Sequence, residues 1–104
     1  MALKVEVARS EHKATMTLAG ELDFHTSSEL RTALERVLGV PGLKVLTLDL
    51  TGLNLMDSSG LGMLLFASKE MEKLRGRVLL KTNRLVRELL KISNLERFFE
   101  TAAD

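Results

Sequence analysis

LTLDLTGLNLMDSSGLGMLL, residues 46–65, places a strand, a polar turn and the start of a helix in succession. Apolar residues up to Leu50 and again over 53–56 indicate a buried strand, and the Asp-Ser-Ser at 57–59 has the residue types found at helix N-caps. Leu61, Leu64 and Leu65 then share one helical face. Both serines are therefore expected where a helix has unpaired backbone N–H groups and the positive end of its dipole.

Two strands are predicted at the start of the chain. Residues 3–7 alternate charged and apolar side chains, and 14–19 form a second strand after a polar turn at 10–13. Such a short connection predicts an antiparallel hairpin. Residues 20–25 then leave the second strand as a polar loop that carries two carboxylates.

A first helix follows this loop. Thr26 to Glu29 match a capping box, in which Thr26 accepts from the backbone and Glu29 reaches back. Gly39 is expected to end the helix at the C′ position, and Pro41-Gly42 prevents its continuation. The apolar face is formed by Leu30, Ala33, Leu34, Val37 and Leu38.

Further strand and helix units fill the second half. Residues 43–50 are nearly continuous in apolar character, which is typical of a central strand covered on both faces. A second helix is predicted from about Ser58 to Arg75, ending at Gly76, and a fourth strand at 77–81.

The last part of the chain predicts a third helix and a short strand. Asn83 is its expected N-cap. Phe98 and Phe99 predict the strand, and residues 101–104 are expected to fray. The apolar face of the third helix is predicted to comprise Leu85, Val86, Leu89 and Ile92.

These elements predict an α/β fold with a mixed sheet of four or five strands, the first antiparallel to the rest. Because crossovers between parallel strands are right-handed, consecutive crossovers place the helices mainly on one face. The carboxyl ends of the second and third strands then lie side by side. The loop at 20–26 is thereby brought next to 57–59, at the edge where α/β folds usually bind ligands.

The composition limits the class of protein. A length of 104 residues predicts a single domain over 1–104, and 45% hydrophobic with 28% charged residues is typical of a soluble globular protein. The formal charge of +1 gives no argument for nucleic acid, and there is no cysteine for disulfides or thiolate chemistry. Without a visible signal peptide or an apolar run of about 20 residues, we expect a cytoplasmic protein without membrane contact.

The two serines allow a purely structural interpretation as well as catalytic or phosphate-binding ones. One serine is accounted for if it simply caps the helix. A Ser–His hydrolase would need His25 as its base, but the turn lacks the Gly-x-Ser-x-Gly of a nucleophile elbow. Gly60 and Gly62 suit a phosphate cradle, yet the lysine of a P-loop is missing. We therefore predict no catalytic residue and no cofactor.

A cation site was the other alternative. Glu21, Asp23 and Asp57 offer three carboxylates from two loops, which would suit Mg²⁺ or Ca²⁺. Their spacing follows no ordered ligand pattern, so surface charges explain them better. We predict no metal site.

Gly20-Glu21-Leu22-Asp23 before a capped helix, and Asp57-Ser58-Ser59-Gly60-Leu61-Gly62 after a hydrophobic strand, resemble the STAS family. The most similar branch is the bacterial anti-sigma-factor antagonists, and the resemblance runs from residue 3 to about residue 100. In that branch the first serine after the aspartate is the phosphoacceptor, which is Ser58 here. The resemblance implies an anti-sigma-factor serine kinase and a metal-dependent serine phosphatase as partners. Family members often continue into a further C-terminal helix, whereas this sequence stops at Asp104.

The resemblance implies a regulatory binding protein rather than an enzyme. Unmodified Ser58 is small and neutral, whereas phosphorylation adds a charge of about −1.5 to −2, which is costly to bury in an interface. Capture of the kinase would free a sigma factor in a stress response, and phosphorylation of Ser58 would end the capture. The alternative is a non-switching STAS scaffold of a stress-signalling or lipid-transport complex. The predicted partner-binding residues are Asp23, Asp57, Ser58, Ser59, Gly60 and Gly62.

Overall fold

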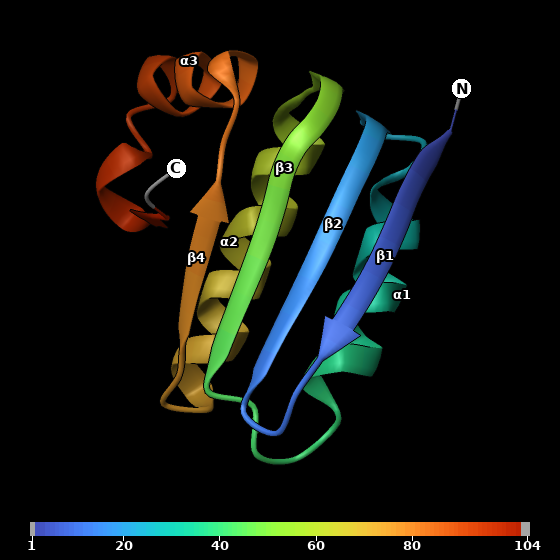
Figure 1. Ribbon diagram of the computed structural model, residues 1–104. Coiled ribbons are helices and arrows are strands. Elements are labelled where there is room, and N and C mark those ends of the chain that lie inside the picture. Colours follow the sequence, from blue (N-terminus) through green and yellow to red (C-terminus); the bar gives the residue numbers. More distant parts are fainter. Residues whose placement is uncertain (1, 103–104) are drawn as a thin grey trace.

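The computed structural model describes residues 2–102, and these contain one mixed sheet with the strand order β1-β2-β3-β4-β5 (Figure 1). The first two strands are antiparallel and the later pairs are parallel, which confirms the predicted fold class. The strands are β1 (Leu3–Arg9), β2 (Lys13–Leu22), β3 (Val45–Met56), β4 (Arg77–Lys81) and β5 (Glu100–Thr101).

The helices connect the parallel strands. Helix α1 (Ser27–Leu38) joins β2 to β3, and α2 (Ser58–Lys73) joins β3 to β4. Figure 1 shows both behind the sheet, as the handedness rule predicts, whereas α3 (Arg84–Ile92) lies beyond the end of β4. A short 3₁₀ helix, η1 (Glu96–Phe98), leads into β5. No helix within residues 2–102 combines the length and the hydrophobicity needed to cross a membrane.

The core lies between the sheet and helices α1 and α2. Alternate residues of the central strands face these helices, so Leu46, Leu48 and Leu50 of β3 are fully buried while Thr47 and Asp49 between them are only half-buried. The prediction that this strand is covered on both faces is therefore wrong. The largest fully buried side chains are Met16, Leu18, Leu22, Leu30, Leu34, Leu43, Leu46, Leu48, Leu50, Leu64, Met71 and Leu80.

The two central strands extend further than the sequence pattern predicts. Strand β2 includes 20–22, which we expected in a loop, because Gly20 adopts a φ of +103° and the pairing to β3 continues through local register shifts. Strand β3 continues to Met56, which pairs with Leu22. Both extensions end at the same edge of the sheet.

The C-terminal elements differ from expectation in detail. Helix α3 buries Val86 and Leu90, whereas Leu85 is 37% and Ile92 80% exposed, so the predicted apolar face was wrong at both ends. The last strand begins at Glu100 rather than at Phe98. Thr101 pairs with Leu80 of β4, so the fraying predicted for it is wrong; residues 103–104 lie outside the described residues.

The predicted helix ends agree with the structure only in part, whereas the predicted apolar face of α1 is confirmed. Asn83 caps α3, where its side chain accepts from Val86 N at 2.9 Å. Helix α1 ends at Gly39, but that glycine has a φ of −75° and is right-handed, not the left-handed C′ residue that we expected. Helix α2 ends at Lys73, and the left-handed position that follows it is Arg75 at a φ of +57°.

Candidate functional site

Two loops that are distant in the sequence meet at the carboxyl ends of β2 and β3, as predicted. The last residue pair of these strands is Leu22 with Met56. Asp57 N donates to Leu22 O at 3.2 Å, and Phe24 N donates to Asp57 Oδ2 at 3.2 Å. We call the residues of these loops, 23–26 and 57–62, the switch surface.

Asp57 holds the switch surface together. It is the N-cap of α2, with Oδ1 accepting from Ser59 N at 2.8 Å, while its other carboxylate oxygen accepts from Phe24 N. One side chain therefore satisfies an orphan N–H of the helix and fixes the neighbouring loop. The alternative in which a serine is the N-cap is wrong, because the aspartate occupies that position.

Ser58 is the first residue of α2 and is exposed. Among residues 2–102, no side chain or backbone group forms a hydrogen bond with its hydroxyl. Ser59, one position later, is half-buried. A modifying enzyme can therefore reach the Ser58 hydroxyl more easily than that of Ser59.

Asp23 organises the other loop. Its Oδ1 accepts from His25 N at 2.8 Å and from Thr26 N at 3.1 Å. Partial burial acts to raise the pKa of the Asp23 carboxyl, but the hydrogen bonds from His25 and Thr26 and the nearby His25 charge outweigh it. The net result is a pKa below the ordinary value of an aspartate.

Thr26 does not act in a capping box. Its hydroxyl donates to Glu21 O at 2.7 Å and accepts from Asp23 N at 3.0 Å, and the residue is only 4% exposed. Thr26 is the N-cap by position, but its side chain makes no cap hydrogen bond. The predicted capping box is wrong because this hydroxyl closes the turn after β2 and so is not available to the helix.

The two glycines of the switch surface have different surroundings. Gly60 is buried, and a Cβ there would collide with Met56 Cγ and come within 3.0 Å of Leu22 Cγ. The missing side chain of Gly60 therefore makes room for the protein's own core, and its predicted part in partner binding stays a prediction. At the exposed Gly62, a Cβ would meet nothing within 4 Å, so that position remains open to a partner.

Known proteins share this fold and sequence pattern. The STAS domain pattern matches residues 4–104. The chain belongs to the STAS domain family. An anti-sigma F factor antagonist of Lysinibacillus sphaericus is 33% identical over 79 residues, 75% of this chain and 68% of that protein. An anti-sigma-B factor antagonist of Listeria monocytogenes is 32% identical over 103 residues, 96% of this chain and 89% of that protein.

A solved structure supports the same grouping. The Bacillus cell fate determinant SpoIIAA, in its phosphorylated form, aligns with a TM-score of 0.74 and 25% identity, over 99% of this chain and 93% of that one. The predicted resemblance is thus confirmed: this STAS protein is similar to anti-sigma factor antagonists.

Phe24 is a residue of this STAS domain that sequence reasoning missed. It is 75% exposed, and its ring meets the His25 ring edge-on, with 5.6 Å between centroids. The signal was present in the sequence, since Phe24 is an apolar residue in a turn otherwise made of polar side chains. Its backbone N–H donates to Asp57, so the turn that carries the ring is tied to the residue that precedes Ser58.

The hydrolase interpretation finds no support in the STAS fold. His25 is exposed, and in the described part of the chain it forms no hydrogen bond with Ser58 or Ser59. Its ring packs on Phe24 instead. A general base must be within hydrogen-bond reach of its nucleophile.

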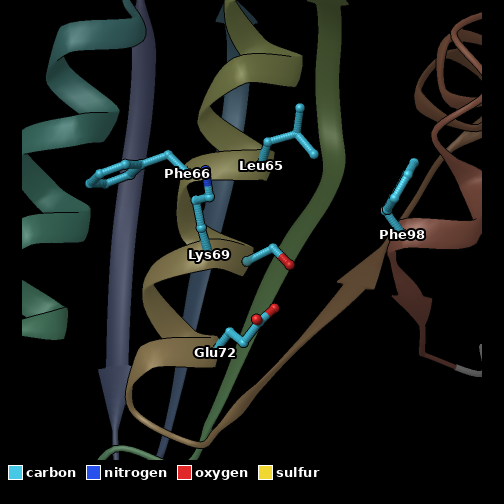
Figure 2. A pocket seen from close by; sticks show the side chains of 6 residues that line it. Leu65, Phe66, Lys69, Glu72 and Phe98 are labelled. Carbon is cyan, nitrogen blue, oxygen red and sulfur yellow. The ribbon is translucent and has the colours of Figure 1, made fainter.

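The cation interpretation would need several carboxylates close together. Nowhere in residues 2–102 do three His, Cys, Asp or Glu side chains come close enough to hold a metal ion. The pocket in Figure 2 lies between α2 and the C-terminal segment, and Ser58 is not among its lining residues. It is lined by Leu65, Phe66, Ser68, Lys69, Glu72 and Phe98.

Proposed function

We propose that this STAS protein is a phosphorylation-switched anti-sigma-factor antagonist. In this proposal it binds an anti-sigma-factor serine kinase through the switch surface and so frees a sigma factor. Phosphorylation of Ser58 ends the interaction, and a metal-dependent serine phosphatase restores it. The observation that carries the proposal is the exposed Ser58 hydroxyl at the start of α2, directly after Asp57, which also binds the backbone of the exposed Phe24.

The unmodified surface is suited to docking. Phe24 offers an exposed aromatic side chain of a kind that is enriched in protein–protein interfaces. Ser58 and Gly62 are small and exposed, so a partner can close over the helix start without meeting bulk. The carboxylates of Asp23 and Asp57 already accept backbone hydrogen bonds, which lowers the cost of covering them.

Phosphorylation changes this surface without threatening the fold. The dipole of α2 favours a negative charge at its N-terminus by about 0.3–1 kcal/mol at an exposed position. Residues 20–26 and 57–62 contain no Lys or Arg to pair with a phosphate, and Asp23 and Asp57 add negative charge. The modified helix should therefore persist. The phosphate, however, finds no Lys or Arg in these two loops to neutralise its charge.

The interface carries the larger effect. Burying a phosphate dianion without cations costs several kcal/mol, well above the gain from the helix dipole. A net loss of about 3–4 kcal/mol weakens binding by roughly 10²–10³-fold. Phosphorylation is therefore expected to release the kinase and leave the fold intact.

The test is a pull-down from native cell extract with the immobilised chain. Unmodified protein and Ser58→Ala should retain the kinase, and Ser58→Asp should lose it with an unchanged circular dichroism spectrum. Ser10→Asp is the matched control, because exposed Ser10 lies in the β1–β2 turn at the opposite end of the sheet. Equal binding by Ser58→Asp and Ser10→Asp would contradict the proposal.

The same experiment separates the switch from a static scaffold. A non-switching STAS scaffold would bind its partners equally with serine or aspartate at position 58. It would also take up no phosphate from the captured kinase and ATP. The charge of +1 and the absence of a basic cluster in the sequence support a protein partner rather than nucleic acid.

A further inference from the structure

The two edges of the sheet differ greatly in length. Strand β5 is only 2 residues long, whereas β1 is a 7-residue edge strand paired only on its β2 side. Proteins commonly protect sheet edges by keeping edge strands short. The β5 edge is protected in this way and the β1 edge is not.

The hydrogen-bond pattern shows which groups face the open edge. Ser10 N donates to Lys13 O at 2.9 Å, and Glu21 N donates to Ala2 O at 3.3 Å. Even-numbered residues of β1 therefore bond to β2, because bonded and non-bonded pairs alternate in an antiparallel ladder. The N–H and C=O groups of Leu3, Val5 and Val7 point away from β2, toward the open edge.

We propose that this edge pairs with β1 of a second copy of the chain, antiparallel and with Val5 of both copies on the two-fold axis. Leu3 is then opposite Val7 of the second copy, and the outward N–H and C=O groups are satisfied reciprocally. The two five-stranded sheets become one continuous sheet with an isologous interface.

Charge complementarity selects the second copy and the register. Lys4 and Glu6 lie on the face away from the helices and form a 3.1 Å ion pair, with side chains 74% and 65% exposed. In the proposed register Lys4 is opposite Glu6 of the second copy, and this pair occurs twice. Sliding one strand by two residues in either direction places Lys4 opposite Lys4, or Glu6 opposite Glu6, which is destabilising.

The other face of the edge supplies apolar surface. A groove of about 400 Å³ runs between β1 and α1, and Val7 and Val40 on it are each 48% exposed. Arg9 anchors the end of the strand to the end of α1, with Nη1 donating to Val37 O at 3.1 Å. The two-fold axis brings the grooves of both copies together, so these valines are covered on pairing. The groove is lined by Val5, Val7, Arg9, Ala33, Arg36, Val37 and Val40.

This interface is separate from the switch surface and does not depend on the proposed function. Ser58 begins α2, which follows β3, and strand β2 separates β3 from β1. Dimerisation therefore leaves Ser58 accessible. A failure to dimerise would leave the phosphorylation proposal untouched, and the reverse also holds.

Sedimentation equilibrium of the full chain tests the pairing through a charge swap. The wild type should reach twice the monomer mass of 11.6 kDa as concentration rises. Lys4→Glu and Glu6→Lys should each weaken the dimer by about tenfold, because both cross-strand pairs become repulsive. The double variant restores both pairs with reversed signs and should recover wild-type affinity.

Arg84→Glu is the matched control, since it changes the net charge by the same amount as Lys4→Glu at an exposed position on α3. It should leave the dimer unchanged. A wild-type mass that stays monomeric up to about 1 mM would overturn the proposal. So would a dimer that is insensitive to the single reversals or is not rescued by the double swap.

Disulfide trapping tests the register independently. The chain has no cysteine, so Lys4→Cys and Glu6→Cys each introduce a single thiol at an exposed position. The two positions form a non-hydrogen-bonded pair, with about 4.5 Å between Cα atoms, which a disulfide can span. Under mild oxidation, an equal mixture of the two variants should give a clearly higher yield of cross-linked dimer than either variant alone. Equal yields from the mixture and from the single variants would contradict the register.

Discussion

Helices α1 and α2 both begin at the same end of the sheet, and each begins with a serine, Ser27 in α1 and Ser58 in α2. Ser27 is half-buried and its hydroxyl donates to Phe24 O at 3.4 Å. Ser58 is exposed, and its hydroxyl makes no hydrogen bond within residues 2–102. The same residue type at equivalent helix positions thus has a structural role in one helix and is exposed and unbonded in the other.

The preceding residues cause this difference. At α2 the carboxylate of Asp57 meets the needs of the helix start and of the neighbouring loop, which leaves the serine uncommitted. At α1 the hydroxyl of the cap residue Thr26 donates to Glu21 O and accepts from Asp23 N. The turn before the helix therefore uses this hydroxyl for its own hydrogen bonds. Whether the serine hydroxyl at a helix start is left unbonded therefore depends on the hydrogen bonds that the adjacent side chains form.

The largest effect is expected for phosphate incorporation. Ser58→Ala should abolish labelling by the captured kinase with ATP, whereas Ser27→Ala should leave it near the wild-type level, because of these two hydroxyls that of Ser58 is exposed and unbonded and that of Ser27 is not. Mass spectrometry of the labelled protein provides the measurement. Phosphate on Ser59 or Ser27 would show that exposure at the helix start does not select the acceptor.

Loss of the aromatic side chain beside Ser58 should weaken partner binding. Phe24→Ala removes a side chain that is 75% exposed in the free protein, so the fold should be little affected. If Phe24 is an interface hot spot, affinity falls by about 30-fold, equivalent to roughly 2 kcal/mol.

The matched control for Phe24 is Phe98, which is 53% exposed and follows α3 in η1. Calorimetric titration of the kinase with both alanine variants is the measurement. Phe98→Ala should bind like the wild type. Equal losses for the two variants would mean that the switch surface as defined does not contain the main docking contacts.

Much of this fold could be predicted from local patterns. Strict alternation at 3–7, the run at 77–81 and the Asn83 cap each correspond to the observed elements, because each depends on neighbours in the sequence. The meeting of the two loops also follows from chain order and handedness alone. These signals placed Asp23, Asp57 and Ser58 at one edge of the sheet.

Competition between side chains could not be predicted in the same way. Thr26 fits a capping box by spacing, but its hydroxyl satisfies Glu21 O, a choice that depends on β2 continuing to Leu22. Gly60 looked like an opening for a partner, but its surroundings come from Met56 and Leu22 on two different strands. The pairing that extends β2 decided the first case and packing between two strands decided the second, and neither follows from local residue spacing.

The smallest predicted effect concerns the carboxylate that closes the turn before α1. Because hydrogen bonds lower the pKa of Asp23 in the folded protein, protonation favours the unfolded chain. The stabilisation is therefore fully present above the unfolded pKa of about 3.9 and is lost as the pH falls through the lower folded pKa. Asp23→Asn removes this titration, so its stability should fall less steeply between pH 5 and pH 2 than that of the wild type.

Urea unfolding midpoints of both proteins at a series of pH values measure the difference. The variant should be slightly less stable than the wild type at pH 7, because an amide is a weaker acceptor than a carboxylate for the N–H groups of His25 and Thr26. The two curves should converge in acid, where the wild-type carboxyl is protonated too. Parallel curves over the whole range would show that the turn before α1 does not owe its closure to the charge on Asp23.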